Sequence, residues 1–194
     1  MACISPIYTA QWADPQLPVQ SINGGANASA SRLTGLLSVS TGAIGAASYA
    51  AWAHLGQNFV IEPAATRVTL YVTPTIEYWV KAESWFGSYY SSEALAHLIL
   101  WNDTGAEVIH DVRSLFRALA PFWWYVDSGI VRVPVGMVRT VTRTPSAAPQ
   151  AWHAAFGLQS FAGGAGFGGA HANASCSLTR ICVDQFDASG RQLA

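Results

Sequence analysis

Apolar and polar residues alternate along the stretch from Arg67 to Trp101, and this alternation is the strongest structural signal in the chain. The even positions of its first part carry Val68, Leu70, Val72, Ile76, Tyr78 and Val80, and those of its second part carry Ala94, Ala96, Leu98 and Leu100. Successive side chains of a strand point to opposite faces of the sheet. A period of two therefore predicts strands with one buried face and one solvated face.

Weaker alternation recurs along the rest of the chain, at 26–41, 131–137, 152–158 and 171–186. Asn102-Asp-Thr-Gly, Asp127-Ser-Gly and other turn signals separate these segments. Residues 46–55 fit either a strand or an alanine-rich helix, and the glycines that crowd this segment favour the strand. Short strands divided by turns predict an all-β protein, with two antiparallel sheets stacked as a β-sandwich or a jelly-roll-like fold.

One segment departs from the strand pattern. Val112, Leu115, Phe116 and Leu119 recur at helical spacing, Asp111 could cap the first turn, and Pro121 would end it. This spacing predicts one short helix over 111–120. The alternative is a strand that continues from Glu107.

The domain organisation expected from the sequence is simple. Pro6, Pro15 and Pro18 predict an irregular lead-in over residues 1–25, and residues 26–194 are expected to form a single β-sandwich domain. We expect no signal peptide, because Arg32 is the first basic residue. No apolar run approaches the roughly 20 residues of a membrane span. The sequence leaves the cellular location open.

The composition indicates a surface that is unusually poor in charge. Hydrophobic residues make up 51% of the chain and charged residues 11%, against a usual charged share of about 25%. Such a surface must consist of small polar residues or be covered by another chain, so we expect a homo-oligomer or a partner protein. A net charge of −1 and scattered arginines argue against nucleic acid as a partner.

The sequence contains no convincing signature for catalysis, metal binding or a cofactor. Residues 164–169 match GxGxxG, but no helix pattern follows them as a dinucleotide site requires. The histidines are not spaced as zinc ligands, and no nucleophile motif is present. We therefore expect no catalytic residue, metal or cofactor. Whether Cys176 and Cys182 form a disulfide or stay reduced is left open.

Aromatic residues are the remaining candidates for a binding site, since the chain holds 8 Trp, 7 Tyr and 8 Phe. They cluster at 78–90 and 122–125, and the predicted binding residues are Trp79, Trp85, Tyr89, Tyr90, Trp123 and Trp124. Neighbouring strand residues face opposite ways, so Trp123 and Trp124 cannot both enter the core. The outward residue could stack on a sugar or an apolar ligand, or be buried by a neighbouring subunit. A second small core is the structural alternative.

These patterns predict a non-catalytic β-sandwich module that acts by surface recognition or self-assembly, such as a subunit of a secreted or phage-like particle. Two alternatives remain. One is an isomerase or cyclase with an aromatic-lined pocket for an apolar substrate. The other is a lectin-like module that binds carbohydrate. No motif is specific enough to name a family.

Overall fold

The computed structural model describes residues 2–4, 8–15, 23–178 and 180–193, and its regular elements are all strands. They are β1 (Ala2–Ile4), β2 (Tyr8–Pro15), β3 (Asn23–Ser31), β4 (Leu36–Ile44), β5 (Ala47–Ile61), β6 (Arg67–Val72), β7 (Thr75–Trp101), β8 (Glu107–Pro121), β9 (Tyr125–Asp127), β10 (Val131–Pro134), β11 (Met137–Thr142), β12 (Gln150–Ser177) and β13 (Ile181–Phe186). The all-β expectation is confirmed. The described residues include no helix that could span a membrane.

The 28-residue strand β12 lies at the centre of a nine-stranded antiparallel sheet. One edge of β12 pairs with β7 along almost its whole length. Its other edge pairs first with β5 and then with β4, which follow each other along the same side. β7 carries β8, β9 and β10 on its far edge, and β2 and β3 flank β5 and β4.

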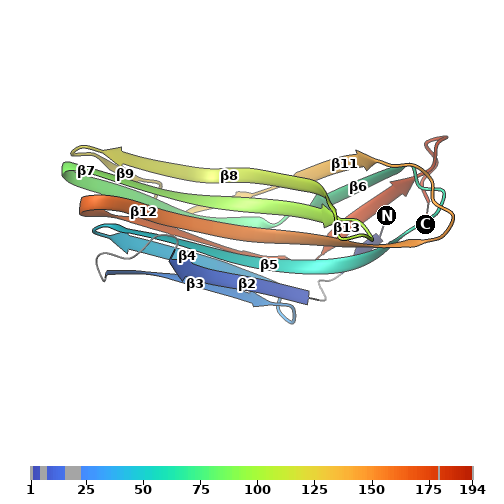
Figure 1. Ribbon diagram of the computed structural model, residues 1–194, viewed down its shortest axis with the longest axis horizontal. Coiled ribbons are helices and arrows are strands. Elements are labelled where there is room, and N and C mark those ends of the chain that lie inside the picture. Colours follow the sequence, from blue (N-terminus) through green and yellow to red (C-terminus); the bar gives the residue numbers. More distant parts are fainter. Residues whose placement is uncertain (1, 5–7, 16–22, 179, 194) are drawn as a thin grey trace.

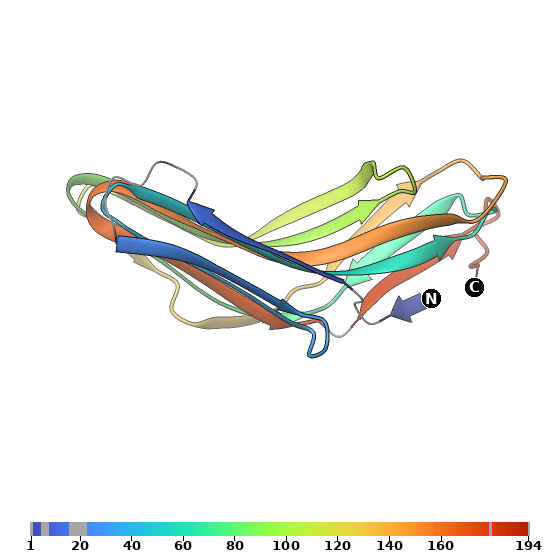
Figure 2. The same cartoon turned by 60° about the horizontal axis from the view of Figure 1, so that its bottom comes forward.

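This large sheet folds over at one end, so that its two halves become the layers of a sandwich (Figures 1 and 2). β7, β12 and the β4–β5 connection all turn there, at a place we call the closed end. The first layer holds β2, β5, β8 and the adjoining halves of β7 and β12; the second holds β3, β4, β9, β10 and the other halves. Across the fold, the Ser92 hydroxyl donates to the carbonyl of Lys81 at 2.6 Å.

A four-stranded sheet of order β1-β13-β6-β11 extends the second layer away from the closed end. It packs against β5 and β8 of the first layer. Arg139 of β11 forms an ion pair with Asp111 of β8 at 2.7 Å. Gln185 of β13 accepts a hydrogen bond from the amide of Glu62 at 2.7 Å and donates one to the carbonyl of Val60 at 2.8 Å. These contacts hold the open end of the sandwich together.

The core between the layers is built from alternate residues of the long strands, as the sequence predicts. Every even position named above for 67–101 is buried in the structure. β12 adds Phe156 and Leu158, and β5 adds Leu55 and Ile61, all with no exposed surface. Burying a side chain of this size contributes about 1.5–3 kcal/mol, so the packed layers supply most of the stability of the fold.

The helix expected over 111–120 is wrong, and the alternative of a strand from Glu107 is correct. β8 has a bulge opposite Ala94 and Leu95, where Phe116 and Ser114 are their register partners and Leu115 is the additional residue. A bulge shifts the alternation by one residue. The shift brings apolar residues to intervals of three and four, which imitates a helical pattern. Val112 and Leu119 are exposed on this edge strand.

Two other expectations can be compared with the structure. Of segment 46–55, residues 47–55 are a strand, part of β5. The residues expected to be an irregular lead-in contain β1, β2 and the start of β3, which pair with β13, β5 and β4. That expectation is therefore wrong for 2–4, 8–15 and 23–25. Residues 1, 5–7 and 16–22 of this segment lie outside the described part of the chain.

The cysteines do not form the local bridge that the sequence left open. Cys182 is disulfide-bonded, and its backbone register partner in β1 is Cys3. Cys176 is a free, buried thiol. Its burial raises the pKa of the thiol to about 12, which makes it unreactive at neutral pH.

Candidate functional site

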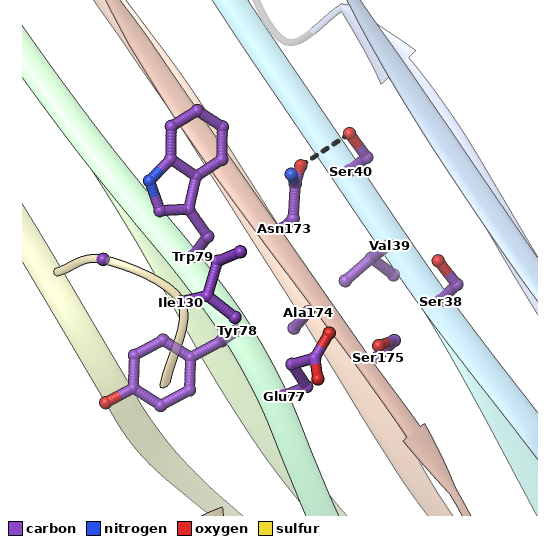
Figure 3. Close-up of a pocket in the computed structure, with 11 residues that line it drawn as sticks. Ser38, Val39, Ser40, Glu77, Tyr78, Trp79, Ile130, Asn173, Ala174 and Ser175 are labelled. Carbon is purple, nitrogen blue, oxygen red and sulfur yellow. Dashed lines mark hydrogen bonds between the residues drawn. The ribbon is translucent and has the colours of Figure 1, made fainter. Parts of the chain in front are cut away.

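An open groove of about 630 Å³ crosses the outer face of the second layer (Figure 3). β12 forms its floor, β4 one side, and β7 with the loop 128–130 the other side. Its lining residues are Ser38, Val39, Ser40, Glu77, Tyr78, Trp79, Gly129, Ile130, Asn173, Ala174 and Ser175. Ile130 is 80% exposed and overhangs the groove from the loop.

The polar residues of the groove form two cross-strand rows. One row runs from Ser40 through Asn173 to Trp79, and the next from Ser38 through Ser175 to Glu77. The Ser40 hydroxyl donates to Oδ1 of Asn173 at 2.7 Å, which leaves the amide N–H groups of Asn173 for another acceptor. Of these residues, the sequence predicted only Trp79 as a binding residue, because Ser and Asn are common on solvated strand faces. The sequence did indicate that these side chains lie on the outer face of the sheet, because they alternate with buried residues.

Trp79 is held in a fixed position at the side of the groove. Its indole N–H donates to Oδ1 of Asp127 at 2.9 Å, and its ring stacks on the imidazole of His171 with 5.9 Å between centroids and 15° between planes. Asp127 also accepts the amide of Gly129 at 2.7 Å, and this bond is the main reason that the pKa of its carboxyl is lowered. The charged carboxylate thus ties Trp79 to the loop beside it.

A second candidate surface lies at the closed end, where aromatic side chains protrude from the turns. We call it the aromatic tip; it consists of Trp85, Phe86, Tyr89, Phe122, Trp123, Trp124, Tyr125 and Phe167, which are between 49% and 71% exposed. Glu83 and Ser84 join four of these residues around a small hollow of about 120 Å³. Exposed aromatic clusters of this kind mark interaction sites in soluble proteins.

The backbone of the tip is strained at three of its aromatic residues. Phe86, Phe122 and Trp123 have φ angles of 53°, 47° and 56°, in the left-handed region that bulky side chains rarely adopt. The ring of Phe86 packs edge-on against Trp123 at 4.4 Å and against Phe167 at 6.2 Å. Strained backbone of this type persists where the surrounding structure requires it and is concentrated at functional sites.

The structure divides the predicted binding residues among three places. Trp79 lines the groove. Trp85, Tyr89, Trp123 and Trp124 belong to the aromatic tip, and both of the adjacent tryptophans are exposed. Tyr90 is fully buried, so its side chain cannot contact a ligand at the surface.

Tyr90 has a structural role at the closed end. Its hydroxyl lies 2.9 Å from the carbonyl oxygen of Gly45 and 2.8 Å from that of Gly166, and it donates to this pair. Tyr90→Phe leaves both carbonyls without this donor, and we expect it to lower the free energy of unfolding by about 1–2 kcal/mol. Urea denaturation followed by circular dichroism measures the change. An unchanged midpoint would show that the hydroxyl does not hold the fold-over in place.

A histidine cluster that the sequence did not predict lies on the outer face of the first layer. His54, His97 and His110 come from β5, β7 and β8, and Nδ1 of His97 lies 3.2 Å from Nε2 of His110. His54 covers Gly157, where a Cβ atom would lie 1.6 Å from its ring. His97 alternates with the core residues Ala96 and Leu98 and so lies on the outer face of β7, but it is buried there. Among the described residues, no group of potential ligands converges as a metal site.

Comparison with known proteins does not identify a family. No known family and no curated protein matches the sequence. Solved structures match only weakly. The enzymatically active domain of tailspike protein 4 of bacteriophage CBA120 has 10% sequence identity and a TM-score of 0.26, and the match covers 89% of this chain and 19% of that one. The carbohydrate-binding module TmCBM61 in complex with β-1,4-galactotriose has 9% identity and a TM-score of 0.22, and the match covers 84% of this chain and 88% of that one. Infectious bursal disease virus, Gt strain, gives 11% identity, a TM-score of 0.19, and coverage of 92% and 42%. The chain spans about a fifth of the tailspike domain that it matches.

Proposed function

We propose that the protein is a non-catalytic recognition module that binds a carbohydrate chain in the groove of the second layer. The observation that carries this proposal is the fixed indole of Trp79 beside rows of hydroxyl and amide side chains on β4 and β12.

The chemistry of the groove matches the two kinds of surface on a sugar ring. The C–H face of the ring packs against an aromatic side chain, which Trp79 provides. The sugar hydroxyls both donate and accept hydrogen bonds. Ser38 and Ser175 can do the same, the Asn173 amide supplies donors, and the Glu77 carboxylate supplies an acceptor.

The groove is also organised before any ligand arrives. Asp127 and His171 hold the Trp79 ring, and the hydrogen bond from Ser40 orients Asn173. A site whose side chains are already fixed loses less conformational entropy on binding. Figure 3 shows Trp79 at one side of the groove, Asn173 on its floor, and the hydrogen bond that joins Asn173 to Ser40.

Recognition explains the groove better than catalysis does. Glycoside hydrolysis ordinarily requires two carboxyl groups that flank the scissile bond. Glu77 is the only acid among the described residues that line the groove. An isomerase or cyclase needs a chamber that excludes water, whereas this groove is open along the face of the sheet.

Trp79→Ala is expected to weaken oligosaccharide binding at least tenfold, because the stacking surface is lost, while Trp79→Phe retains part of the affinity. Asn173→Ala removes a donor and should weaken binding by roughly fivefold to tenfold. The probes are soluble α- and β-linked oligomers of glucose, galactose and mannose. Isothermal titration calorimetry measures each dissociation constant.

Trp124→Ala is the matched control, because it removes an exposed indole that lies outside the groove. This variant should bind the same oligosaccharide with unchanged affinity. The proposal fails if the wild-type protein binds no member of the panel. It also fails if Trp124→Ala loses binding and Trp79→Ala keeps it, since the tip would then be the sugar site.

A further inference from the structure

We propose that the aromatic tip inserts into the interfacial region of a lipid bilayer, with a preference for zwitterionic headgroups. This inference is independent of the carbohydrate groove. It depends on the distribution of charge around the closed end, on the hydrogen bonding of its backbone, and on the chemistry of its tryptophans.

Four of the segments that meet at the closed end carry no charged residue. These segments are 42–50, 84–92, 118–126 and 157–170, and none of them contains Asp, Glu, Lys, Arg or His. Although the whole chain has few charges, the boundary between these uncharged segments and the charged residues behind them is sharp along the long axis of the molecule. A charged side chain at membrane depth is costly, so these turns can enter an apolar phase at little electrostatic cost.

Charged residues of both signs begin directly behind the tip, and Asp14 of β2 lies at this level because its register partner is Ala50. Lys81 and Glu83 form an ion pair at 3.0 Å, and Glu93 faces Arg117 at 4.0 Å in the other layer. Asp127 completes this collar and accepts the Tyr125 hydroxyl at 2.9 Å. The collar lies at the level where headgroups would meet an inserted tip. Because it combines both signs, it is complementary to zwitterionic headgroups rather than to an anionic surface.

Much of the backbone at the turns is hydrogen-bonded within the protein, as an apolar environment demands. The amide of Phe122 donates to the carbonyl of Ser88 at 3.0 Å, and the amide of Ser84 donates to the carbonyl of Trp124 at 2.9 Å. The Ser88 hydroxyl accepts the amide of Phe167 at 2.7 Å and donates to the carbonyl of Trp85. These groups need no water when the tip leaves the solvent.

The side chains of the tip suit the boundary between lipid and water. Trp and Tyr join an apolar ring to a polar group, and both residues are enriched at membrane interfaces. Within the described part of the chain, the indole N–H groups of Trp85, Trp123 and Trp124 donate to no other group of the protein. They can donate to lipid carbonyl or phosphate oxygens while the rings occupy the upper acyl region.

The shape of the tip favours a bilayer over a second copy of the chain. The tip is a rounded end made of turns (Figures 1 and 2), whereas a stable dimer usually needs about 800 Å² of complementary surface on each partner. A fluid bilayer adapts to a convex end. Membrane insertion therefore uses the protruding rings without requiring a matching surface.

Sedimentation with phosphatidylcholine vesicles tests the proposal on the whole chain. We expect the protein to bind these vesicles equally well at 50 mM and 500 mM salt, because the attraction is not ionic. Tryptophan fluorescence should shift to shorter wavelength, and brominated phosphatidylcholine should quench it. The double variant Phe86→Asn, Trp123→Asn should bind at least tenfold more weakly. Asparagine tolerates positive φ, so this variant is expected to fold.

Val138→Asn is the matched control, since Val138 is similarly exposed but lies on β11, away from the closed end. It should bind vesicles as the wild type does. Absence of binding to phosphatidylcholine would overturn the proposal, and so would binding that needs anionic lipid and disappears at high salt. Light scattering without lipid supplies a further outcome: a wild-type oligomer that the double variant converts to a monomer would identify the tip as a subunit contact instead.

Discussion

Gly164→Ala is expected to lower the free energy of unfolding by about 3 kcal/mol, at the upper end of the effects of an inserted methyl group. A Cβ atom at this position would lie 2.4 Å from the carbonyl oxygen of Tyr89 and 2.5 Å from Cδ1 of Tyr90. One of these neighbours is backbone in the adjacent strand, and the other belongs to a fully buried ring. Neither can move without opening the fold-over at the closed end.

Gly169→Ala is the matched control for this prediction. It adds the same methyl group to the same strand, but its nearest neighbours would be the Ala43 oxygen at 3.5 Å and Cγ1 of Ile44 at 3.7 Å, which are ordinary contacts. Urea denaturation of the wild type and the two variants measures the free energy of unfolding. We expect a large decrease for Gly164→Ala and a change within about 0.5 kcal/mol for Gly169→Ala. Equal midpoints for the two variants would contradict the close packing described at Gly164.

The core could be predicted from the sequence because strand alternation depends only on local geometry. Leu98 and Leu158 are buried for the reason their spacing indicates. The fold-over could not be predicted in this way. The glycines of 164–169 indicate a flexible loop or a bulge, and the pairing of β12 with β7 is indeed irregular between Ala165 and Phe167. The sequence does not show that β12 turns back there and stays paired with β7 on both sides of the irregularity. At Gly164, the close approach of the Tyr89 carbonyl and the Tyr90 ring explains why glycine is needed.

The candidate sites were predictable to different degrees. Strand parity predicts that one of Trp123 and Trp124 faces outward. Both are exposed, because residues 122–124 form the turn between β8 and β9 and not a strand. The burial of Tyr90 does not follow from parity, because it depends on carbonyl groups from β12 and the β4–β5 connection. The groove and the histidine cluster depend on register between distant strands. His54 and His97 both lie opposite Gly157, and no spacing within the sequence reveals that.

The histidine cluster makes the stability of the protein sensitive to acid. Burial, assisted by the neighbouring imidazoles, lowers the pKa of His54 to about 4. Burial and the neighbouring His110 lower the pKa of His97 to about 4. The Gln159 side chain partly opposes this shift, although the buried Nε2 atom of His97 has no well-aligned hydrogen bond. Each imidazole has a pKa near 6.5 in the unfolded chain. Between pH 6.5 and 4 the unfolded state therefore binds more protons than the folded state does.

Stability from these two groups is complete above pH 6.5 and is lost as the pH falls toward 4. The displacement of each pKa corresponds to about 3 kcal/mol, so we expect a marked fall in the free energy of unfolding between pH 7 and pH 4. Urea denaturation at each pH measures it. His97→Gln should remove about half of the acid sensitivity, whereas His153→Gln, outside the cluster, should leave it unchanged. An equal pH dependence in wild type and His97→Gln would show that carboxyl groups, and not this cluster, set the response to acid.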